Sequence, residues 1–151
     1  MEYDVQKEAR VWQRVQEGKQ TPSRQEEPLP ALIREQQMLS SVYMQMARQR
    51  TGHSSTVLMG LARQARSQAA CLRGIVLLSG GNHPQPSPVP MQSVAPEQLL
   101  NRCYGQELRL LREYENRCGD AQFGPAYTVM ARRAREICCT LLELIGMAKT
   151  K

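Results

Sequence analysis

The chain has 151 residues, of which 41% are hydrophobic and only 5% aromatic, and its formal net charge is +6. So few aromatic residues imply an aliphatic core, which favours packed helices over a β-sandwich. The chain contains no apolar run of about eighteen residues, the minimum for a membrane span, and its charged N-terminus does not resemble a secretory signal. We therefore expect a cytoplasmic, all-α protein.

Residues 1–27 are expected to form an N-terminal arm that begins with a short helix. Apolar residues recur there at spacings of three to four, and the segment EGKQTPSRQEEP then interrupts the pattern. Trp12, flanked by Val11 and Val15, is the expected anchor, packed either on the main body or on a second copy of the chain. This arm favours a homo-oligomer, most simply a dimer.

The main body, residues 28–151, begins with a predicted helical hairpin formed by residues 31–50 and 55–78. Between them, Gly52 is expected near the C-terminus of the first helix, and Ser54 or Ser55 as the N-cap of the second helix. The expected buried stripe of the first helix is Leu32, Ile33, Gln36, Leu39, Ser40, Tyr43, Met46 and Ala47. That of the second helix is Leu58, Leu61, Ala62, Ala65, Gln68, Ala69, Leu72 and Ile75 or Val76.

A second hairpin is predicted from residues 96–117 and 125–147. Its stripes are Leu100, Cys103, Tyr104, Glu107, Leu110, Leu111, Tyr114 and Cys118, and then Tyr127, Met130, Ala131, Ala134, Ile137, Cys138, Leu141, Leu144 and Ile145. The segment between the hairpins, about residues 79–96, is rich in proline and glycine and is expected to be a long crossover. Two hairpins joined in this way predict a four-helix bundle with ferritin-like connectivity.

The two hairpins also resemble one another in sequence. The stretches ARQARSQAACL, from Ala62, and ARRAREICCTL, from Ala131, share five of eleven residues. Gln36 precedes Tyr43 by seven residues, and Glu107 precedes Tyr114 by the same interval. The chain is therefore predicted to contain two copies of one helical hairpin.

This doubled pattern, over about residues 28–146, resembles the rubrerythrin-type ferritin-like family. The family places Glu-x6-Tyr on its first and third helices and Ala-x-x-Glu-x-x-His on its second and fourth. Glu and His three positions apart share a helix face, so four such faces surround two iron ions. The resemblance implies a bundle with tyrosines, here Tyr43 and Tyr114, in its core. The family's rubredoxin tail, with its Cys-x-x-Cys pairs, has no counterpart in this sequence.

The resemblance also assigns the family's ligand positions to residues of this chain, and most of them cannot bind iron. In chain order, these positions hold Gln36, Ala65, Gln68, Glu107, Ala134 and Ile137. Only Glu107 keeps a carboxylate. The two histidines, His53 and His83, fall in segments expected to be loops. We therefore expect no metal and no cofactor, although the family would imply two irons.

The resulting expectation is a non-catalytic ferritin-like bundle with a structural, interaction or small-ligand-binding role. Glu107 is then a buried acid paired with Gln36, Gln68 or a tyrosine hydroxyl. The alternative is an iron-dependent oxidoreductase or peroxidase with shifted ligands, drawn from Glu35, Glu107, Glu136 and Glu143. In the first interpretation these carboxylates, Glu107 apart, are solvated surface charges.

Two further classes of function are disfavoured by residue pattern. The arginines, including Arg132, Arg133 and Arg135, are mixed with glutamate and glutamine and are not interleaved with aromatic residues. This pattern indicates solvated helix faces and not a nucleic-acid interface. The cysteines have no Cys-x-x-Cys spacing, so a zinc or rubredoxin-type site is not predicted. We expect Cys71, Cys103, Cys118, Cys138 and Cys139 to be buried or half-buried thiols.

Overall fold

The computed structural model describes residues 27–81 and 96–149, and within these ranges all regular secondary structure is helical. The four helices are α2 (Leu29–Arg48), α3 (His53–Leu78), α4 (Pro96–Asn116) and α5 (Gly124–Lys149). The four predicted helices are therefore confirmed, with ends displaced by at most two residues. The expectations for the N-terminal arm, the crossover and His83 lie outside the described residues, apart from Glu27 in the arm and residues 79–81 and 96 in the crossover.

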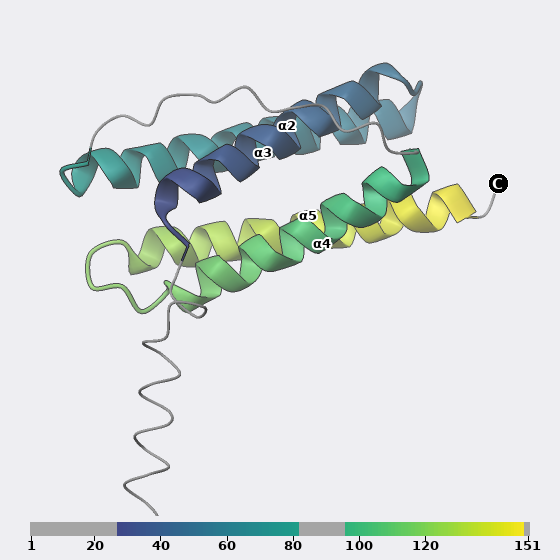
Figure 1. The fold of residues 1–151 in the computed structure, drawn as a ribbon. Coiled ribbons are helices and arrows are strands. Elements are labelled where there is room, and N and C mark those ends of the chain that lie inside the picture. The colour runs from purple at the N-terminus through teal and green to yellow at the C-terminus, as the bar shows by residue number, and fades with distance from the viewer. Residues whose placement is uncertain (1–26, 82–95, 150–151) are drawn as a thin grey trace, which may run out of the picture.

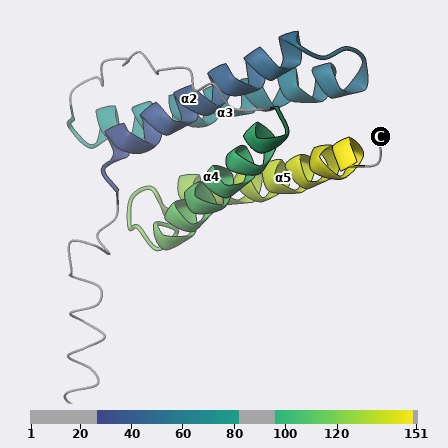
Figure 2. The ribbon, with the colours of Figure 1, turned by 45° about the vertical axis from the view of Figure 1, so that its right-hand side comes forward.

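The helices form two antiparallel hairpins that stack as two layers (Figure 1). α2 lies close to α3, α4 lies close to α5, and the layers meet where α2 faces α4 and α3 faces α5. Figure 2 shows the same two layers from a second direction. α3 ends at one end of the molecule, and α4 begins at the other end (Figure 1). Because α2 runs antiparallel to α3, α2 and α4 also run in opposite directions.

The core is formed by the apolar stripes that the helical period predicts. On α2 and α3 every residue of the expected stripe is buried. On the second hairpin Tyr104, Cys118 and Ile145 are only half-buried. Arg117 is buried next to Cys118, with its guanidinium 5.9 Å from the centroid of the Tyr127 ring. None of the described helices combines the length and the apolar character that crossing a membrane would require.

The loop between α2 and α3 differs from the prediction in two respects. The N-cap of α3 is Gly52, with a φ of 70°, and not Ser54 or Ser55. A positive φ is easily adopted by glycine because it has no Cβ. The predicted loop residue His53 is instead the first residue of the helix. The Ser55 hydroxyl donates to the Ala47 carbonyl, at 2.8 Å, and so serves the end of α2.

Candidate functional site

Two hydrogen bonds cross the interface between the hairpins where α2 faces α4. The Gln36 side-chain amide donates to the Tyr114 hydroxyl at 2.6 Å, and the Tyr43 hydroxyl donates to Glu107 Oε1 at 2.8 Å. All four side chains are 0% exposed. Gln36 and Glu107 occupy equivalent positions in the two hairpins, and so do Tyr43 and Tyr114. Each bond therefore joins the polar residue of one hairpin to the tyrosine of the other. The internal repeat of the sequence is thus repeated in the hydrogen bonding of the core.

On α3 and α5, the positions that the resemblance assigns to metal ligands hold mainly apolar residues. Ala65, Ala134 and Ile137 are fully buried members of the core. Gln68 is also fully buried, and its amide donates to the Met130 carbonyl on α5 at 3.0 Å. Gln68 therefore spans the two layers on this side of the bundle, but its counterpart in the repeat, Ile137, has no polar atom with which to do so.

Three oxygen atoms of these buried side chains are left without a hydrogen bond. Within the described part of the chain, no donor lies within hydrogen-bond distance of Gln36 Oε1, Gln68 Oε1 or Glu107 Oε2. Each of the three residues uses its other polar atom in a contact that spans the two hairpins. Buried polar atoms are almost always hydrogen-bonded in folded proteins, so these three oxygen atoms are exceptions.

The carboxyl group of Glu107 has an unusual affinity for protons. Burial disfavours its charged form and raises its pKa from 4.5 to about 7, although the hydrogen bond from Tyr43 acts in the opposite direction. Burial also raises the pKa of Cys103 to about 12 and of Cys138 to about 11, and the Glu107 charge adds to both shifts. The pKa of Tyr43 is raised for the same two reasons. At neutral pH Glu107 is therefore the group of this cluster that exchanges a proton.

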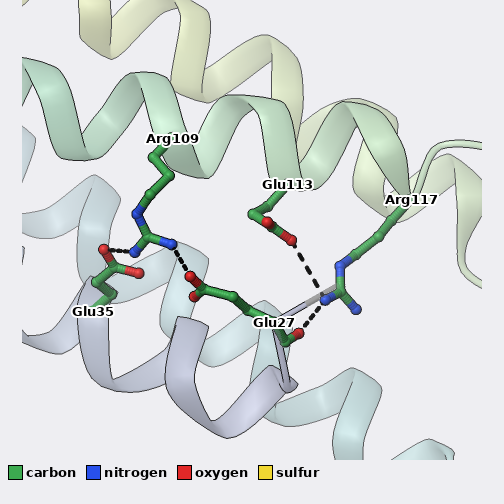
Figure 3. A network of polar contacts seen from close by, with 5 residues as sticks. All are labelled: Glu27, Glu35, Arg109, Glu113 and Arg117. Atoms are coloured by element: carbon green, nitrogen blue, oxygen red, sulfur yellow. Dashed lines mark hydrogen bonds and ion pairs between the residues drawn. The ribbon is translucent and has the colours of Figure 1, made fainter. Parts of the chain in front are cut away.

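Glu35, the carboxylate adjacent to Gln36, takes part in a surface network and not in the core. Figure 3 shows Arg109, on α4, placed between Glu35 on α2 and Glu27 just before that helix. Arg117 contacts the Glu113 carboxylate at 3.7 Å and donates to the main-chain carbonyl of Glu27. The network therefore fixes the start of α2 against α4 and uses Glu35 as an ion-pair partner.

The other two candidate carboxylates, Glu136 and Glu143, are exposed on α5. Glu136 lines a surface hollow of about 380 Å³ between α3 and α5, together with Arg63 and Arg133. Glu143 lines a neighbouring hollow of about 340 Å³. Neither carboxylate therefore lies in the core with Glu107.

The donor set of the core does not match that of a di-iron site. Of the residues at the family's ligand positions only Glu107 offers a carboxylate, and His53 lies exposed at the start of α3. In residues 27–81 and 96–149 no three His, Cys, Asp or Glu side chains are grouped so that they could hold a metal ion. The expectation for the cysteines needs one correction. Cys103 and Cys138 are buried and Cys71 and Cys118 half-buried, but Cys139 is exposed because it points away from the α5 core stripe.

Comparison with known proteins gives no further information about this site. No family model, no curated protein and no solved structure matches the chain. Sequence reasoning missed the buried Arg117 and its contact with Glu27. The four-residue interval between Glu113 and Arg117 was the available signal, since side chains at that spacing are neighbours on a helix.

Proposed function

We propose that this protein is a non-catalytic bundle of the rubrerythrin-type ferritin-like kind that has lost its di-iron site and retains a structural or interaction role. The observation that carries the proposal is the identity of the buried residues at the family's ligand positions. Ala65, Ala134 and Ile137 pack there as ordinary core residues, and Gln36 and Gln68 are neutral.

Electrostatics supports this proposal. Two ferrous ions would bring four positive charges into a buried space, and uncompensated charge in a protein core is strongly unfavourable. Glu107, the one buried carboxylate among the described residues, already accepts a hydrogen bond from Tyr43. Alanine and isoleucine have no lone pair to donate to a metal, so the remaining positions cannot compensate. Glu35, Glu136 and Glu143 lie outside the core, and they do not favour the alternative of an iron enzyme with shifted ligands.

Self-association is the second part of the proposal. The sequence of residues 1–27 offers an apolar set around Trp12 that would cover a neighbouring bundle in a side-by-side dimer. Sedimentation equilibrium of the full chain, compared with the Trp12→Ala variant, tests this part. A wild-type chain that sediments as a monomer at all accessible concentrations would contradict it.

Metal analysis tests the loss of the di-iron site. The full chain is purified from iron-supplemented cells without chelator, and iron is measured by mass spectrometry relative to protein. We expect far less than one iron per chain, whereas a value near two would refute the proposal. A variant that restores the family's ligands serves as a positive control, with the substitutions Gln36→Glu, Ala65→Glu, Gln68→His, Ala134→Glu and Ile137→His.

A further inference from the structure

The three unpaired oxygen atoms of the core belong to side chains that cross between the two hairpins. Gln36 reaches from α2 to Tyr114 on α4, Glu107 from α4 to Tyr43 on α2, and Gln68 from α3 to the α5 backbone. Each of these side chains therefore extends into the space between the two hairpins. The backbones also approach one another less closely between the hairpins than within them. All three side chains thus lie where the helix backbones are farther apart.

The two amide oxygens require the same kind of partner, and so does Glu107 Oε2 while its carboxyl is ionised. Gln36 Oε1, Gln68 Oε1 and the ionised Glu107 Oε2 are acceptors, and none has a hydrogen-bond partner among the described residues. An unpaired acceptor in a core loses its hydrogen bonds to water on folding and gains nothing in return. A fully apolar pair of layers would not have this cost. The arrangement therefore indicates an occupant that donates hydrogen bonds.

Tyr114 adds a requirement of the opposite kind. Its hydroxyl oxygen accepts the hydrogen bond from Gln36, so its own hydrogen remains to be donated. The occupant must therefore be able to accept a hydrogen bond as well as donate. Water has both properties, whereas a metal ion or ammonium cannot accept. Polar sites with several partners are also where buried water molecules are found.

We propose that the interface between the hairpins is a binding site for ordered water, held by Gln36, Gln68 and Glu107. This inference rests on the proposed function, because iron ligands at the same positions would exclude it. The bound water would complete the hydrogen bonding of the core and place an exchangeable proton donor beside the Glu107 carboxyl.

Oxygen-17 magnetic relaxation dispersion tests the proposal, because it counts water molecules that remain in a protein for longer than nanoseconds. The samples are the full chain purified without chelator, the double variant Gln36→Met/Gln68→Met, and Ser40→Ala as the matched control. Ser40 is a buried polar residue whose hydroxyl donates to the Ala62 carbonyl inside the first hairpin, at 2.9 Å. A chain of this size holds about five buried waters in all, so the measurement of interest is the difference between variants.

We expect the double variant to lose about one to two water equivalents and the Ser40→Ala variant to lose none. An unchanged dispersion in a folded double variant would overturn the proposal. If the double variant does not fold, high-resolution crystallography of the wild-type chain decides, because the proposal requires solvent density within hydrogen-bond distance of the three oxygens. Iron near two per chain in the same preparation would refute the proposed function, whereas an iron-free core without long-lived water refutes only this inference.

Discussion

Replacing Glu107 by glutamine should change how the stability of the fold depends on pH. In the unfolded chain Glu107 has a pKa near 4.5, whereas burial raises its pKa in the bundle to about 7. The folded state therefore binds a proton more tightly than the unfolded state. The stability that this proton contributes is complete below about pH 4.5 and is lost as the pH rises through about 7.

The size of the effect follows from the two pKa values. One pKa unit corresponds to about 1.4 kcal/mol, so the difference between 4.5 and about 7 amounts to about 3 kcal/mol in the free energy of unfolding. Glutamine has nearly the same shape as glutamate and does not ionise, and its carbonyl can still accept the hydrogen bond from Tyr43. The stability of the Glu107→Gln variant should therefore not fall in this way as the pH rises.

Urea denaturation of both proteins at several pH values measures the effect, and the difference between them cancels the contributions of all other groups. We expect the free energy of unfolding of Glu107→Gln, relative to wild type, to increase by about 3 kcal/mol between about pH 4.5 and about pH 8. Tyr43, Cys103 and Cys138 stay protonated throughout, since their pKa values are raised as well. If the difference in free energy of unfolding between the two proteins stays constant with pH, within about 0.5 kcal/mol, burial does not hold a proton on this carboxyl.

Three other perturbations give distinct expected results. Tyr43→Phe should lower the free energy of unfolding by about 1–3 kcal/mol at about pH 8, because it removes the hydrogen bond that the Glu107 carboxylate accepts from Tyr43. Urea denaturation that finds no loss would contradict this role. Arg109→Ala should cost less than about 1 kcal/mol in the same assay, because its ion pairs are partly exposed, and a larger loss would mean that the network is more than a surface contact. With a chromogenic disulfide reagent, Cys139→Ser should abolish the fastest thiol reaction, whereas Cys103 should react only on unfolding; a fast phase that persists in the variant would show that another thiol is accessible.

The helical period was sufficient to predict most of the core. Every predicted core position on α2 and α3 is buried, including the polar residues Gln36, Ser40 and Gln68. A period of 3.6 residues places these side chains on the same face as their apolar neighbours whatever their polarity. The interval between Gln36 and Tyr43, repeated at Glu107 and Tyr114, also identified the four side chains that pair in the core.

Other features depend on contacts between different helices, and the sequence of a single helix does not predict them. Ser55 has the residue type of an N-cap, but its hydroxyl donates to the end of α2, which only the geometry of the hairpin brings near. The sequence left three partners open for Glu107, and the antiparallel placement of α2 and α4 selects Tyr43. Arg117 is buried because its guanidinium reaches the Glu27 carbonyl, just before α2, and the Tyr127 ring on α5.

The crossed pairing of Gln36 with Tyr114 and of Glu107 with Tyr43 has a consequence for the symmetry of the core. A hairpin that carries a polar side chain seven residues before a tyrosine is self-complementary, because two identical copies related by a two-fold axis form both bonds at once. Two copies of one such hairpin would therefore form this core as a homodimer. The two halves of this chain depart from that symmetry where Gln68 of the first hairpin is replaced by Ile137 at the equivalent position of the second.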